Sequence, residues 1–235
     1  MSRRLKVSAA QLGPINRADS RQSVVARLVE MLKEADSRGS KFVVFPELAL
    51  TTFFPRWWME DQAEVDKYFE VGDIGFNVWK MFKEDVIVGQ CICNDRRWPE
   101  TFRVMGLKGA EMVVLGYNTP TDNVYAPKEP PYLRVFHHNL SIQAAAYQNG
   151  IWVVATAKAG KEDGFWLHGG TAIVAPTGEI VAKSNTEEDE VVSYDCDMEL
   201  GEYIRNTTFN FARHRRPEHY KLITERTGVK VEPSN

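Results

Sequence analysis

The chain has 235 residues, of which 43% are hydrophobic and 26% are charged, and its 29 basic and 32 acidic residues give a net charge of −3. A chain of this size buries roughly 70–75% of the surface that its unfolded form exposes. We therefore expect one globular domain over residues 1–235. A slightly negative net charge gives no overall positive field for nucleic acid or an anionic membrane, so neither is expected as a partner.

The sequence also carries no signal for a membrane, a disulfide framework or a metal. It lacks the run of about 18 apolar residues that a spanning helix needs, and its start reaches the polar Gln11 too early for a secretory signal. The three cysteines, Cys91, Cys93 and Cys196, are odd in number and lack zinc-site spacing. We expect a cytoplasmic protein with reduced thiols and no metal or other cofactor.

Short apolar runs alternate with helical patterns along the first two thirds of the chain, which predicts an α/β fold with layered helices and strands. A helix capped by Asp19 or Ser20 ends at Gly39, and a hairpin is expected around Thr177 and Gly178. Beyond residue 197 the chain becomes aromatic and basic, so residues 203–235 are expected to form a C-terminal arm. Predicted strands are 5–12, 41–45, 86–93, 111–117, 151–157, 170–176, 179–183 and 190–196, and further predicted helices are 99–108 and 137–149.

Cys93 is the best candidate for a nucleophile. It ends an apolar strand and precedes two arginines and the helix that begins near Pro99. A helix N-terminus and guanidinium groups both favour a thiolate, so the sequence predicts a lowered pKa for this thiol. A free cysteine is also a common small core residue, and Cys91, two residues earlier, fits that interpretation. Spacing alone leaves both interpretations of Cys93 open.

Glu47 and Asn118 also follow predicted strands. Ligands bind at the carboxyl ends of strands in α/β sheets, where a carboxylate beside an apolar wall can act as a base. Glu47 can equally cap a turn or pair with Arg56. Asn118 can bind substrate from the same rim or serve an ordinary turn.

The pair Arg96–Arg97 can bind a carboxylate through its planar guanidinium groups, or it can be a surface charge pair. The adjacent His137 and His138 diverge on a helix and cannot both hold one metal, so they are interpreted as structural. The sequence supports no metal site.

These segments together resemble the nitrilase superfamily of carbon-nitrogen hydrolases. The resemblance rests on VFPELALTTFFPRW around Glu47, CICNDRRWPETF around Cys93, GYNTPT around Asn118, SIQAAAYQNGIWVVA, IVAPTGEIVA and HRRPEHY, and it covers residues 5–223 in family order. It implies a four-layer α-β-β-α sandwich that assembles into dimers or tetramers, with the arm reaching across a subunit interface.

The resemblance further implies a Glu-Lys-Cys triad, with Glu47 as general base and Cys93 as nucleophile. Arg96 and Arg97 match the family's clamp for a substrate carboxylate, and Asn118 lies on the same rim. The implied reaction converts an N-carbamoyl-D-amino acid to the D-amino acid, ammonia and carbon dioxide through a Cys-linked intermediate. The implied partner is therefore a small carboxylate-bearing substrate.

The spacing departs from the family pattern in one place. Glu47 and Cys93 are 93 − 47 = 46 residues apart, whereas the family has a longer segment there that carries several strands and the lysine. The pattern predicts an internal deletion near residues 70–72, loss of part of the central strands and absence of the family lysine. Lys80 and Lys83 are interpreted as lysines of a solvated face and not as replacements.

Two functions follow. The first is a carbon-nitrogen hydrolase, supported by each retained motif. The second is a catalytically inactive remnant that binds ligands or pairs with an intact paralogue, because loss of the lysine removes oxyanion stabilisation and typically costs ~10²–10³ in rate. Loss of strands also leaves unpaired sheet edges and uncovered apolar surface.

Overall fold

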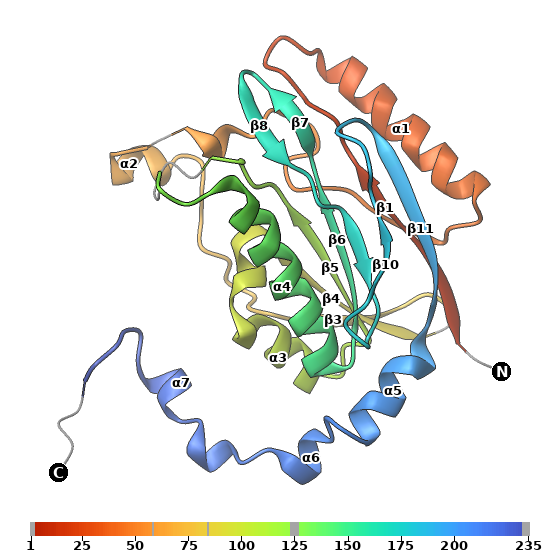
Figure 1. The fold of residues 1–235 in the computed structure, drawn as a ribbon, viewed down its shortest axis with the longest axis vertical. Coiled ribbons are helices and arrows are strands. Elements are labelled where there is room, and N and C mark those ends of the chain that lie inside the picture. Colours follow the sequence, from red (N-terminus) through yellow and green to blue (C-terminus); the bar gives the residue numbers. More distant parts are fainter. Residues whose placement is uncertain (1–2, 58, 84, 123–126, 232–235) are drawn as a thin grey trace.

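The computed structural model describes residues 3–57, 59–83, 85–122 and 127–231. Two β-sheets face each other between two helical layers (Figure 1). The smaller sheet has the order β11-β1-β2, with β1 antiparallel to β11 and parallel to β2. The larger sheet has the order β10-β9-β6-β5-β4-β3, and β4, β5 and β6 run parallel at its centre. The strands of the two sheets are Arg4–Gln11 (β1), Phe42–Val44 (β2), Val78–Met81 (β3), Val86–Ile92 (β4), Met112–Tyr117 (β5), Trp152–Ala157 (β6), Ala172–Val174 (β9), Ile180–Lys183 (β10) and Glu190–Asp197 (β11).

Helix α1 (Arg21–Ser37) covers the outer face of the smaller sheet. The Ser20 side chain caps it by accepting from the Ser23 N–H, as predicted, and Gly39 follows it with a left-handed φ of 80°. Helices α3 (Pro99–Leu107) and α4 (Pro131–Asn149) cover the larger sheet. The structure thus has the predicted order of four layers, α-β-β-α.

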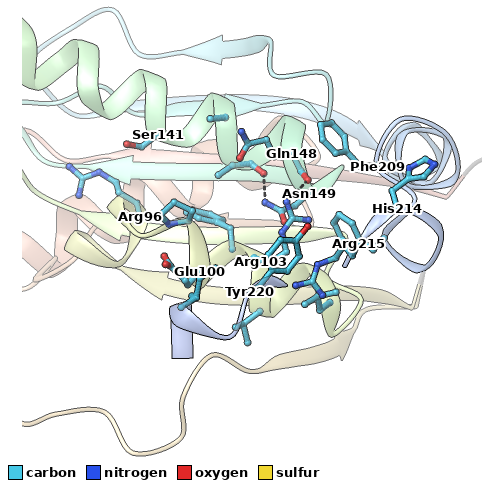
Figure 2. Close-up of a pocket in the computed structure, with 18 of the residues that line it drawn as sticks. Arg96, Glu100, Arg103, Ser141, Gln148, Asn149, Phe209, His214, Arg215 and Tyr220 are labelled. Atoms are coloured by element: carbon cyan, nitrogen blue, oxygen red, sulfur yellow. Dashed lines mark hydrogen bonds between the residues drawn. The ribbon is translucent and has the colours of Figure 1, made fainter. Parts of the chain in front are cut away.

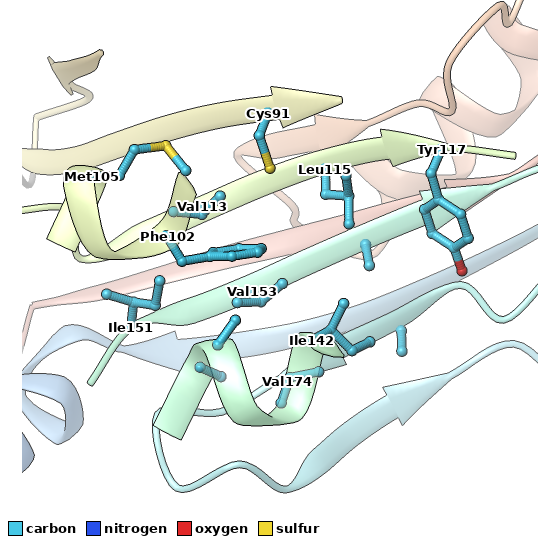
Figure 3. Packing of buried hydrophobic residues seen from close by; sticks show 14 of the residues in the cluster. Cys91, Phe102, Met105, Val113, Leu115, Tyr117, Ile142, Ile151, Val153 and Val174 are labelled. Atoms are coloured by element: carbon cyan, nitrogen blue, oxygen red, sulfur yellow. The ribbon is translucent and has the colours of Figure 1, made fainter. Parts of the chain in front are cut away.

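Three apolar clusters hold these layers together. One fills the space between α1 and the smaller sheet, and another lies between the two sheets, where Val7 and Trp152 are almost fully buried. The third packs α3 and α4 on the larger sheet, with Phe102 and Ile142 meeting the strand residues (Figure 3). Parallel strands covered on both faces explain why β4, β5 and β6 are continuous apolar runs in the sequence.

Some elements differ from the sequence prediction. Helix α4 begins at Pro131, six residues before the predicted start at His137, because a proline in the first turn of a helix needs no hydrogen-bond partner for its nitrogen. Strand β3 and the hairpin of β7 (Ala159–Glu162) and β8 (Phe165–His168) were not predicted, since none of these three short strands is apolar along its whole length.

The segment between β2 and β4 is where a deletion is predicted, and it is sparse in regular structure. In its described residues it contains the short helix α2 (Gln62–Val65), the 3₁₀ turn η1 (Phe54–Arg56) and β3. Lys80 and Lys83 are both exposed. Large apolar side chains are also exposed in this segment: Tyr68, Phe69, Val71, Ile74, Trp79 and Met81. We call these six residues the apolar segment. The exposure of the apolar segment agrees with the uncovered apolar surface that a loss of strands would leave. The deletion itself stays a prediction.

The C-terminal part leaves the layered body after β11. Helix α5 (Met198–Asn206) contacts the body, and the chain then runs beside α3 and α4 as an extended arm (Figure 1). The arm contains short helical turns, which are α6 (Phe211–His214), η3 (Pro217–His219) and α7 (Leu222–Glu225). Within the described residues, no helix is both long and apolar enough to cross a bilayer.

Candidate active site

Cys93 lies at the sharp turn between strand β4 and the 3₁₀ turn η2 (Cys93–Arg97). Its φ is +46°, a left-handed conformation that costs a non-glycine residue about 1–3 kcal/mol. The Asp95 carboxylate stabilises this turn by accepting the Ile92 N–H at 2.9 Å. The turn directs the partly buried Sγ toward the backbone oxygen of Asn118, 3.8 Å away.

Glu47 comes from the loop that follows β2 and lies beside Cys93. A Cβ on Gly116 of β5 would stand only 2.8 Å from the Glu47 backbone nitrogen, so glycine at this position lets the loop approach the sheet. Burial raises the pKa of Glu47, while the Cys93 thiol, Arg96 and Lys158 lower it in part. Its Oε2 atom is buried without a hydrogen-bond partner in the described part of the chain. A buried acceptor of this kind is uncommon and suits a group that receives a proton from a ligand.

Asn118, directly after β5, connects the strand ends that form this site. Its Nδ2 donates to the Glu47 carbonyl at 2.7 Å, and its Oδ1 accepts from the Lys158 backbone N–H at 2.9 Å. The residue is 2% exposed. Both polar atoms of its side chain are therefore hydrogen-bonded within the protein. This favours a positioning role for Asn118 over the predicted contact with substrate.

The pKa of Cys93 is raised, whereas the sequence predicts a lowered pKa. Burial, followed by the charge of Glu47, raises the pKa of the thiol to about 11, against a partial opposing effect of Arg96. The sequence argument counted the helix N-terminus and the arginines but could not include the burial or the nearby carboxylate. At neutral pH the resting Cys93 is therefore a protonated thiol.

The two arginines of the predicted clamp point in different directions. Arg96 is 3% exposed, and it donates to the Cys93 carbonyl at 2.6 Å, the Thr119 hydroxyl at 2.7 Å and His138 Nδ1 at 3.1 Å. Its guanidinium also stacks on the Tyr117 ring. Arg97 is exposed and bonds Asn94 at 3.2 Å. This arrangement does not fit a two-arginine clamp, because Arg96 is an interior residue that supports the nucleophile turn.

Arg96 belongs to a buried polar network that sequence reasoning did not foresee. Because His138 Nδ1 accepts from Arg96, its Nε2 carries the proton and faces the Tyr117 hydroxyl at 2.8 Å. The Tyr117 hydroxyl in turn donates to the Gly169 carbonyl at 2.9 Å. Burial, followed by the charge of Arg96, holds the pKa of His138 well below its usual value, so the ring is neutral.

A second buried cluster, also missed from the sequence, anchors the Glu47 loop. Lys158 and Glu162 are fully buried and ion-paired, with Nζ to Oε2 at 2.9 Å. Arg56 pairs with Glu162 at 2.9 Å and with Asp163 at 2.8 Å, and so does not serve Glu47 as the alternative interpretation proposed. Lys158 directly follows the apolar strand β6, so the rule that selected Glu47 and Asn118 could have identified it.

A pocket beside the helical layer reaches Arg96 and Arg97 of this site. It has a volume of about 830 Å³ and lies between α3, α4 and the arm, where Arg103, Phe209 and Tyr220 line it (Figure 2). Neither Glu47 nor Cys93 is among its lining residues. No group of three or more side chains suited to hold a metal ion occurs in the described ranges.

Comparison with known proteins identifies the family. Residues 57–206, more than half of the chain, match the carbon-nitrogen hydrolase family, and the chain belongs to this family. The chain is 33% identical over 169 residues to N-carbamoylputrescine amidase of Arabidopsis thaliana, a match covering 68% of this chain and 54% of that protein. It is 30% identical over 158 residues to a nitrilase of Pyrococcus abyssi, covering 65% of this chain and 53% of that protein. The chain thus spans about half the length of these curated relatives.

The fold is shared with solved members of this class. A carbon-nitrogen hydrolase from Helicobacter pylori superimposes with a TM-score of 0.79 at 19% sequence identity, covering 96% of this chain and 99% of that one. The prediction of a nitrilase-type α/β fold is confirmed, and so is membership of the nitrilase superfamily. The relatives named above do not single out enzymes for N-carbamoyl-D-amino acids.

Proposed function

We propose that this chain hydrolyses a non-peptide carbon-nitrogen bond in a carbamoyl compound, with Cys93 as nucleophile and Glu47 as general base. The observation that carries this proposal is the partly buried Glu47–Cys93 pair, in which each group alters the pKa of the other. A carboxylate with a raised pKa beside a neutral thiol can take the thiol proton as the sulfur attacks.

The proposed reaction has two stages. Cys93 Sγ attacks the carbamoyl carbon while its proton passes to Glu47. The tetrahedral intermediate collapses, the proton leaves with the amino group as ammonia, and a carbamoyl thioester remains on Cys93. Glu47 then takes a proton from one water as that water attacks the thioester. The products are the free thiol and a carbamic acid, which divides into an amine and carbon dioxide.

We propose a carboxylate-bearing substrate, an N-carbamoyl-D-amino acid, as the finer assignment. The support is the sequence resemblance together with Arg97, whose exposed guanidinium follows the nucleophile turn. A named relative, N-carbamoylputrescine amidase, acts on a carbamoyl compound with an amine end, which makes N-carbamoylputrescine the natural competing substrate.

Ammonia release from the purified chain tests both levels of the proposal. The substrates are N-carbamoyl-D-alanine, its L enantiomer, N-carbamoyl-D-phenylalanine and N-carbamoylputrescine. We expect turnover of the D-carbamoyl acids and its loss in Cys93→Ala, with Cys91→Ala as the matched control that keeps turnover. Turnover of N-carbamoylputrescine alone would reject the finer assignment, and no ammonia from any substrate by a folded sample would reject the hydrolase.

The apolar segment favours a second candidate, an inactive remnant that associates with an intact paralogue. Six exposed apolar side chains between residues 68 and 81 are unusual for a free surface. Co-expression with a full-length relative should then yield mixed oligomers. A chain that stays monomeric or insoluble in that experiment would count against this candidate.

A further inference from the structure

Lys158 is a buried cation that the mechanism above does not use, and it lies against both halves of the candidate site. Its ammonium donates to the Thr51 carbonyl at 2.8 Å and to Glu162 Oε2 at 2.9 Å. Its backbone N–H donates to Asn118 Oδ1 at 2.9 Å. The side chain is 0% exposed, so these contacts are made away from water.

These contacts connect Lys158 to Glu47 by two routes. Through Asn118, the Lys158 backbone orients the amide that donates to the Glu47 carbonyl at 2.7 Å. Through its ammonium, Lys158 holds the carbonyl of Thr51, four residues after Glu47. Glu162 strengthens the second route, because it accepts from the Phe53 backbone at 2.6 Å.

We infer that Lys158 is a positioning residue for the Glu47–Cys93 pair: it fixes the Glu47 loop against the sheet, and it places a buried positive charge against the loop that carries the Glu47 carboxyl group. This inference rests on the proposed function for its purpose, and on the hydrogen bonds of Lys158 for its geometry. It also gives the site a fixed cation in a chain that is predicted to lack the family lysine.

The charges around the pair support an electrostatic role. The charge of Lys158 lowers the pKa of Glu47 against the effect of burial. Arg96 is another cation that acts on the pair; it contacts Tyr117 and His138, and His168 packs against those two rings. On the far side of Lys158 lie Arg56, Glu162 and Asp163. A substitution of Lys158 alone leaves all of these residues in the chain, so it removes only the Lys158 charge.

Two substitutions with opposite expected effects test the inference. Lys158→Met removes the cation and should move the titration midpoint of Glu47 to higher pH. Glu162→Gln removes the anion that partly neutralises Lys158 and should move that midpoint to lower pH. The expected change is at least about threefold in the ratio of ionised to protonated Glu47 at a fixed pH. A double variant, Lys158→Met with Glu162→Gln, removes both charges and should lie between the single variants.

The measurement is a ¹³C NMR titration of glutamate carboxyl carbons in the whole chain, with the Glu47 signal assigned by its loss in Glu47→Gln. Arg56→Met is the matched control, because it removes a buried cation of the same cluster that is not among the charges acting on Glu47. We expect it to lower the melting temperature with a smaller effect on the Glu47 midpoint.

Equal shifts in one direction for Lys158→Met and Glu162→Gln, or no shift in either, would overturn the inference. If Lys158→Met does not fold, Glu162→Gln alone decides the sign. Because the titration needs no turnover, its failure is distinguishable from failure of the proposed hydrolysis.

Discussion

Replacement of Glu47 by glutamine should make the Cys93 thiol more reactive while it abolishes hydrolysis. The pKa of this thiol is raised from 9.0 to about 11, which lowers the thiolate fraction at pH 8 by roughly 100-fold. Burial is the largest cause and the charge of Glu47 the next. Removal of that charge should therefore recover part of the effect, and we expect an increase of about three- to tenfold in alkylation rate.

The assay is the rate of iodoacetamide alkylation at pH 8, followed by peptide mapping. Cys93 is the thiol that should react first, because Cys91 and Cys196 are 5% and 0% exposed. Glu70→Gln, which neutralises an exposed carboxylate, is the matched control and should leave the rate unchanged. A folded Glu47→Gln variant with an unchanged or slower rate would refute the claim that the carboxylate acts on the thiol.

Three further predictions follow from the other groups. Arg96→Gln should lower the free energy of unfolding, measured in urea, by about 3 kcal/mol, because it leaves buried acceptors unpaired. Arg97→Gln should change it by less than about 0.5 kcal/mol and should raise KM for carboxylate substrates only. Equal effects of the two variants would reject the assignment of Arg96 to the interior and Arg97 to the surface. Stability should fall as the pH falls below about 6.5, because His138 and His168 each bind a proton in the unfolded chain but stay neutral in the fold, at about 1.4 kcal/mol per pH unit for each ring. His138→Gln should roughly halve this slope in urea titrations at pH 7.5 and 5.5. Ile74→Lys with Val71→Asp should raise the soluble yield without lowering the melting temperature, and a lowered melting temperature would show that the apolar segment is packed instead of exposed.

The sequence predicted the layers well because their signals are local. Continuous apolar runs define the parallel strands, and Ser20, Gly39 and Gly150 mark helix ends through capping and left-handed turns. The sequence does not define β3, because its side chains are mostly exposed and it has no continuous apolar run.

The site was predicted in part for the same reason. Glu47, Cys93 and Asn118 were found by their position after strands, and the structure brings these three residues together. The direction of the Cys93 pKa and the interior position of Arg96 depend on burial by residues far away in the sequence. Lys158 and Glu162 form a site support only because the hairpin of β7 and β8 folds against the Glu47 loop, which no local pattern reveals.

The most direct test of the central claim is mass spectrometry of the chain quenched during reaction with N-carbamoyl-D-alanine. The account predicts a transient adduct on Cys93, equal in mass to the substrate less ammonia, that is absent in Cys93→Ala and disappears as the substrate is consumed. Ammonia release that persists in Cys93→Ala, or an adduct on Cys91 or Cys196 instead, would contradict it.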